Sequence, residues 1–119
     1  MNYNFPLLKA DQIEVRVGQV MKSGYTLLLY KNARTDAKVL DEMVGMTNWQ
    51  VKFYSVKDSM FASIGIYDDD KEQWIWKDDA GDETQVEKVK GEASDSFKRA
   101  GFKWGIGREL YYTGFLFIK

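Results

Sequence analysis

Residues 84–111 constrain the fold of this chain most, because they have the pattern of one amphipathic helix. Thr84 and Glu87 are spaced as a capping box, which predicts a helix start near Gln85. Gly105 and Gly107 favour left-handed backbone angles, so they predict where the helix ends. Between these signals, apolar residues recur every three or four positions, and we expect this stripe to be buried: Val86, Val89, Ala93, Phe97, Ala100 and Trp104.

The opposite face of this helix is predicted to be basic. At about 100° per residue, that face carries Lys88, Asp95, Lys98, Arg99 and Phe102. Residues 88–108 include six basic and two acidic side chains, in a chain whose net charge is −1, and Arg108 extends the basic cluster past the helix end. Such a surface suits a phosphate backbone, although a solvated charged face is also the ordinary property of a surface helix.

The composition limits the classes of function that fit this chain. With 119 residues, 45% of them hydrophobic and only one a proline, residues 1–119 are predicted to form a single folded domain. The chain has no cysteine and no histidine, so it lacks disulfides, thiolate sites, and the commonest metal ligand and general base. It also lacks a phosphate-binding P-loop motif. We therefore do not expect zinc chemistry, most hydrolytic chemistry or the use of ATP.

The location follows from hydropathy. No apolar run approaches the roughly 20 residues that span a bilayer, and the first residues lack the pattern of a signal peptide. A cytoplasmic protein is expected.

The remaining segments predict an α+β fold. Residues 13–17 and 25–30 have strand character on either side of a turn at 22–24, which predicts a hairpin that exposes Arg16 opposite Val15 and Val17. Asn32 can cap a helix that Gly45 ends. Residues 49–57, 60–67 and 73–77 predict an antiparallel meander, and residues 111–118 a last strand. Residues 4–11 are expected to form an irregular or short helical lead-in.

Two further groups of residues allow more than one interpretation. The acidic clusters at 68–70 and 78–83 are candidates for a hard metal ion, but neither has the ligand spacing of an EF-hand loop, so solvated turns are the simpler interpretation. Trp74 and Trp76 share one side of a strand, where they could stack on bases or pack in the core. Core packing is the simpler interpretation.

Several short blocks between residues 45 and 111 carry a family resemblance. They are G-x-x-N-W from Gly45, I-G-I-Y from Ile64, W-x-W-K from Trp74, G-E-A-S-D-S-F-K-R-A from Gly91, and W-G-I-G-R-x-L-Y from Trp104. Together they resemble the phage and prophage branch of the Rad-fifty-two-type single-strand annealing proteins, the Sak-like recombinases. The pair formed by the last two blocks is the most specific part of this resemblance.

The resemblance implies an ATP-independent phage recombinase that acts in homologous DNA recombination and DNA repair in a bacterial host cell. Such a protein would bind single-stranded DNA and the annealed duplex intermediate, and it would assemble into a homo-oligomeric ring or helical filament. It would not be an enzyme and would need no cofactor, with no catalytic residue, no metal and no membrane association. The exposed apolar residues expected at Phe5, Leu7 and Leu8 are consistent with assembly.

The resemblance also implies a DNA-binding site. Lys98 and Arg99 match the basic pair of the family's helix, and Arg16 matches the arginine of its hairpin; Tyr30 and Arg34 are looser matches. Phe102 departs from the more basic residue that eukaryotic relatives tend to have, and Lys103 is the candidate to replace it. A different class of function stays open, namely a structural or protein-interaction module whose basic helix docks an acidic partner. A magnesium-dependent nuclease that uses the acidic turns is a third hypothesis.

Overall fold

The computed structural model describes residues 4–81, 88–113 and 115–118. In chain order, its elements are η1 (Ala10–Gln12), β1 (Glu14–Met21), β2 (Gly24–Tyr30), α1 (Ala33–Val44), β3 (Trp49–Val56), β4 (Ser59–Asp68), β5 (Gln73–Ala80), α2 (Lys88–Trp104), α3 (Arg108–Thr113) and β6 (Phe115–Ile118). The strands form two antiparallel sheets, ordered β1-β2-β6 and β3-β4-β5. The α+β fold class and the antiparallel meander are therefore confirmed.

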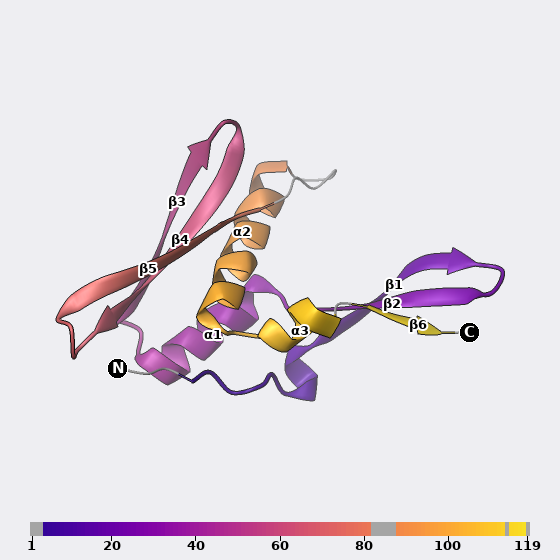
Figure 1. Ribbon diagram of the computed structural model, residues 1–119, viewed down its shortest axis with the longest axis horizontal. Helices are drawn as coiled ribbons and strands as arrows, with labels where there is room; N and C mark the ends of the chain where they lie inside the picture. Colours follow the sequence, from indigo (N-terminus) through magenta and orange to yellow (C-terminus); the bar gives the residue numbers. More distant parts are fainter. Residues whose placement is uncertain (1–3, 82–87, 114, 119) are drawn as a thin grey trace.

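The two sheets lie at opposite ends of an elongated molecule that measures 56 × 33 × 18 Å. Figure 1 shows helices α1, α2 and α3 between them, with α2 against one face of the β3-β4-β5 sheet and the β1-β2 hairpin projecting away. The core lies where α1 and α2 meet β4. It is formed by Val39, Leu40, Val44, Ala62, Ile64, Ile66, Phe97, Ala100 and Ile106.

Local signals in the sequence set the bounds of α1 and the end of α2. The Asn32 side chain accepts a hydrogen bond from the Thr35 amide at 3.1 Å, and Gly45 ends α1 with φ at +95°. Gly105 and Gly107 have φ of +98° and +68°, and they turn the chain from α2 into α3. These caps are confirmed. They could be predicted because each depends on a short-range requirement of the backbone. The capping box predicted at Thr84 and Glu87 lies outside the described residues.

The hairpin differs from its prediction in its burial. The alternation predicted that Arg16 is exposed opposite Val15 and Val17, but all eight residues of β1, both valines included, are exposed. Val15, Val17 and Val20 are 51–75% exposed, so the hairpin has apolar surface that the described chain does not cover. The lead-in is less exposed than expected. Phe5 and Leu8 pack against the core, and of the three apolar residues named there only Leu7 is highly exposed.

The predicted strand at residues 111–118 is wrong in its first half. Residues 111–113 belong to α3, and only β6 is a strand. Leu110 is buried within α3, so tertiary packing overrides the strand propensity of the aromatic residues that follow it. β6 pairs with β2 and therefore completes the hairpin sheet.

The meander corrects two other expectations. β5 continues to Ala80, so Asp78 and Asp79 are strand residues and do not belong to an acidic turn. Trp74 and Trp76 lie outside the core cluster, on the sheet face opposite to Ile64 and Ile66. There the Trp76 ring lies over Gly65, where a Cβ atom would come within 2.7 Å of it.

Candidate nucleic-acid interface

Two basic residues of α2 and the end of the hairpin line one pocket. Lys98 and Arg99 reach it from α2 and Tyr30 from the end of β2, although nearly 70 residues of sequence separate the two elements. The pocket has a volume of about 240 Å³, and its full lining is Leu29, Tyr30, Lys31, Asp95, Lys98, Arg99, Phe102 and Leu110. The structure thus brings together three of the residues that the sequence predicted for a DNA site.

Arg99 is held at this pocket by its own helix. Its Nε donates a hydrogen bond to Asp95 Oδ2 at 2.8 Å, in an i,i+4 ion pair whose side chains are 39% and 26% exposed. Pairs of this kind stabilise a helix by only a few tenths of a kcal/mol. The main effect of Asp95 is therefore to orient the guanidinium group.

Arg16 extends the basic surface along the hairpin. Its guanidinium carbon lies 5.0 Å from the centre of the Tyr30 ring, an arrangement in which the cation is attracted to the π face. Because Arg16 pairs with Leu28 and Tyr30 pairs with Glu14, Arg16 and Tyr30 are on the same face of the hairpin. Arg16 is therefore connected to the pocket through Tyr30.

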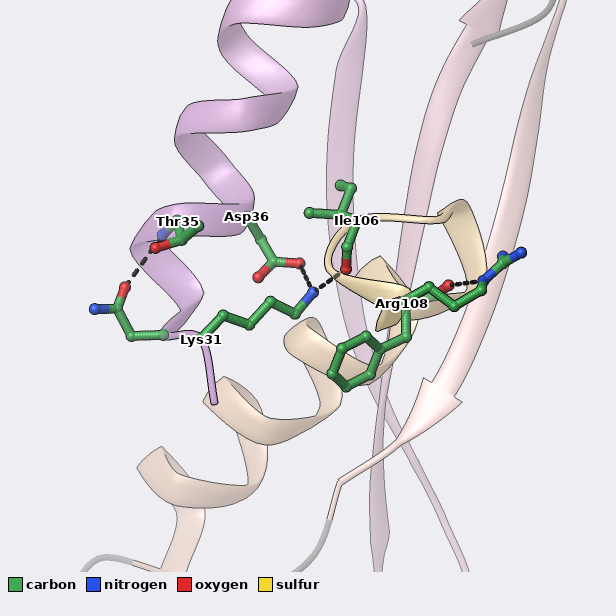
Figure 2. Close-up of polar contacts among 7 residues, drawn as sticks. Lys31, Thr35, Asp36, Ile106 and Arg108 are labelled. Carbon is green, nitrogen blue, oxygen red and sulfur yellow. Dashed lines mark hydrogen bonds and ion pairs between the residues drawn. The ribbon is translucent and has the colours of Figure 1, made fainter. Parts of the chain in front are cut away.

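Beneath the pocket lies a buried ion pair that the sequence analysis missed. Lys31 Nζ donates hydrogen bonds to Asp36 Oδ2 at 2.6 Å and to the Ile106 carbonyl oxygen at 2.7 Å, as Figure 2 shows. The side chains of Lys31 and Asp36 are 1% and 0% exposed. Lys31 Nζ also lies 4.1 Å from the centre of the Phe102 ring. Phe102, predicted on an exposed face, is in fact half-buried against this cation.

The electrostatics of this pair are dominated by desolvation. Burial lowers the pKa of the Lys31 ammonium below its ordinary value of 10.5, and attraction to Asp36 offsets this only in part. Burial likewise raises the pKa of Asp36 from 3.8 to about 6, against the attraction of Lys31. Both shifts disfavour the charged forms, so burying the charged pair costs free energy relative to the solvated groups of the unfolded chain.

Two glycines make room for the pair. A Cβ atom at Gly101 would lie 1.9 Å from Asp36 Oδ2, and one at Gly107 would lie 3.0 Å from Lys31 Cδ. A signal for Asp36 was present in the sequence, because Asp36 follows Ala33 by three residues and precedes Leu40 by four. It therefore lies on the apolar stripe of α1, where a charged residue needs a buried partner.

Lys103 and Arg108 do not join the pocket. Arg108 donates from Nε to the Phe102 carbonyl at 3.0 Å and from Nη2 to the Lys103 carbonyl at 2.7 Å. Lys103 Nζ donates to the Asp78 carbonyl of β5. Arg108 thus donates to carbonyl groups in the last turn of α2, and Lys103 connects α2 to β5 of the sheet. A single basic face along α2, as the sequence predicted, is not confirmed.

Arg34 is also separate from the pocket. It lines a different hollow of about 270 Å³, at the start of α1, together with Lys9, Asp11, Gln12, Asn32, Thr35, Lys38 and Glu42. The charges in this lining are mixed, with three cations and two carboxylates. The looser match at Arg34 is therefore not brought to the other predicted site residues.

The acidic residues that the structure describes show no arrangement suited to a metal ion, and Asp82 and Glu83 of the second predicted cluster lie outside the described residues. Among the described residues, no group of three or more potential side-chain ligands could hold one. Asp68 Oδ1 instead accepts hydrogen bonds from the Asp70 and Lys71 amides, which shapes the β4–β5 turn. Asp78 accepts hydrogen bonds from Ser63 and Tyr54 across the sheet.

Comparisons with family models, curated proteins and solved structures found no match for this chain. In the part of the chain that the structure describes, no helix has the length and apolar character needed to cross a membrane.

Proposed function

We propose that this protein binds single-stranded DNA in the pocket between β2 and α2, and that it anneals complementary strands without ATP. The observation that carries the proposal is the convergence of Lys98, Arg99 and Tyr30 on this pocket, with Arg16 stacked on Tyr30. Cations on a rigid helix can hold phosphates without reading sequence and can leave base edges free to pair. This task needs no catalytic base and no nucleotide cofactor.

Assembly into a homo-oligomer is part of the proposal. A chain with net charge −1 is a poor ligand for a polyanion as a monomer, but a ring or filament would repeat the same basic pocket along one path. The exposed apolar residues of the hairpin, among them Val15, Val17 and Val20, supply surface that a second copy can cover. A protein that stays strictly monomeric at micromolar concentration, with and without DNA, would contradict the proposed oligomer.

The test compares two double variants that remove the same charges from different places. Lys98→Ala with Arg99→Ala removes one lysine and one arginine from the pocket. Arg34→Ala with Lys38→Ala removes the same two residue types from the exposed surface of α1. Affinity for a single-stranded oligonucleotide is measured at several salt concentrations, together with strand annealing, thermal midpoint and assembled mass.

Loss of two phosphate contacts predicts a salt slope that is shallower by about 1.4 for the pocket variant, with slower annealing. The slope of the α1 variant should stay at the parent value. Folding should be preserved in both, because Arg34 and Lys38 are exposed and the partly exposed Arg99–Asp95 pair contributes only a few tenths of a kcal/mol. Equal slopes for the parent and the pocket variant would refute the site. The absence of any single-strand binding at low salt would refute the function and favour an acidic protein partner instead.

A further inference from the structure

The pocket between β2 and α2 has more apolar lining than a phosphate requires. Its walls include Leu29 and Leu110 and the rings of Tyr30 and Phe102, whereas Lys98 and Arg99 supply positive charge. A phosphate is fully hydrophilic and gains nothing from leucine or aromatic walls. An occupant that matches the whole lining must have a flat apolar part and an anionic part close together.

We propose that this pocket takes one unstacked nucleobase of the bound strand, with the adjoining phosphate held by Lys98 and Arg99. This inference rests on the proposed function and specifies the ligand of the same site. A nucleotide is the unit of a single strand that combines a π face with a phosphate. Single-stranded nucleic acids are commonly bound in this way, with bases stacked on aromatic side chains and the backbone followed by cations.

Tyr30 is the residue that the stacking depends on. It is half-buried at the end of β2, and the guanidinium of Arg16 lies against its ring, which limits the positions that the ring can take. Phe102 is held in place by Lys31 Nζ, 4.1 Å from its centre. Both rings are therefore positioned before a ligand binds, which reduces the entropy cost of stacking.

The proposal has a consequence for annealing. A base held in the pocket interrupts the stacking of the strand at that point, while its neighbours remain exposed to a complementary strand. Because every base has a π face, the pocket is expected to tolerate all four bases. One base per subunit would thus be withdrawn from pairing and released as the duplex forms.

The test uses the full chain and two probes of equal length and charge, oligothymidylate and an abasic sugar-phosphate oligomer. Stacking of a single base predicts that the parent protein binds oligothymidylate about 5- to 150-fold more tightly at one salt concentration. Tyr30→Leu should abolish this preference without changing the salt slope, whereas Tyr30→Phe should keep it. The Lys98→Ala/Arg99→Ala variant should bind both probes more weakly but retain the preference.

The outcomes separate this inference from the proposed function. Equal affinity of the parent protein for the two probes would overturn the base pocket and leave phosphate binding intact. A preference that Tyr30→Leu retains, in a variant with the parent thermal midpoint, would overturn the assignment to this pocket. Failure of the parent to bind either probe would overturn both proposals. The comparison of probes on the parent protein does not depend on any variant folding.

Discussion

Replacing Lys31 with methionine removes the cation of the buried pair and keeps an unbranched side chain of similar length. Lys31 is 1% exposed and its ammonium group lies 2.6 Å from Asp36 Oδ2. In the variant, Asp36 stays buried without a counter-charge, and its Oδ1 already accepts no hydrogen bond within the described part of the chain. Leaving one charge of a buried pair without its partner costs up to about 3–5 kcal/mol, and protonation of Asp36, whose pKa is already raised to about 6, limits this cost at pH 7. Domains are stable by only about 5–15 kcal/mol, so this loss is large.

The double variant Lys31→Met/Asp36→Leu tests whether the cost comes from the lost partner or from the lost shape. Leucine has the branching of aspartate, so both changes conserve volume approximately. Since burial already disfavours both charged forms, the double variant should be at least as stable as the parent, and as much as about 1–4 kcal/mol more stable. The assay is urea denaturation at pH 7, followed by circular dichroism, for the parent and the single and double variants.

Two results would refute this reasoning. A Lys31→Met protein within about 1 kcal/mol of the parent at pH 7 would show that Asp36 is not left as an unpaired buried charge. A double variant as unstable as the single one would show that the pair contributes through its specific hydrogen bonds, including the bond to the Ile106 carbonyl.

Two further predictions concern the same junction. The pKa of Asp36 is raised from 3.8 to about 6 in the folded state, so the stability that protonated Asp36 contributes is complete below pH 4 and is lost as pH rises through 6. In denaturation measured between these pH values, the parent should lose roughly 3 kcal/mol of unfolding free energy relative to Lys31→Met/Asp36→Leu. A difference between the two proteins that does not change with pH would contradict this prediction. Gly101→Ala should destabilise the protein by about 1–3 kcal/mol or more in the same assay, because the added Cβ atom would lie 1.9 Å from Asp36 Oδ2. Alanine inside a helix normally adds about 1 kcal/mol of stability over glycine, and a gain of this size would contradict the prediction.

The parts of the fold that the sequence predicted correctly depend on neighbouring residues. Asn32 and Gly45 bound α1 through contacts within one turn of the helix. The meander likewise follows from alternation within each strand and from short turns, such as the one where Lys57 and Asp58 take positive φ. In these places the local preference and the tertiary structure agree.

The errors arise where distant contacts decide the structure. Alternation in β1 predicts a strand but cannot tell whether anything covers it, and the described chain leaves it exposed. Counting charges on α2 cannot distinguish Lys98, which lines the pocket, from Lys103, which binds the Asp78 carbonyl. Arg108, which the same count places in the basic cluster, lies outside this pocket and donates to carbonyl groups at the end of α2, so its contact with DNA stays a prediction.

The candidate site was predictable only as separate residues. Lys98 and Arg99 were expected on an exposed side of the helix, but they are half-buried and line a pocket together with Tyr30. Their meeting with Tyr30 depends on the position of the hairpin, which no spacing in the sequence encodes. Asp36 could have been found from its place on the apolar stripe of α1, whereas its partner Lys31 has no such signal.

The buried pair connects the proposed site to the position of the hairpin. Lys31 directly follows Tyr30 and bonds to α1 through Asp36 and to the chain after α2 through the Ile106 carbonyl. The base of the hairpin is thus fixed, while its outer part, including Val20, is exposed and projects from the body. A partner that covers the outer part would favour particular hairpin orientations, and a strand held between Tyr30 and Lys98 would favour its own. If the partner and the DNA strand favour the same hairpin orientation, assembly raises the affinity for DNA, and DNA raises the affinity for the partner by the same factor, because such coupling is reciprocal.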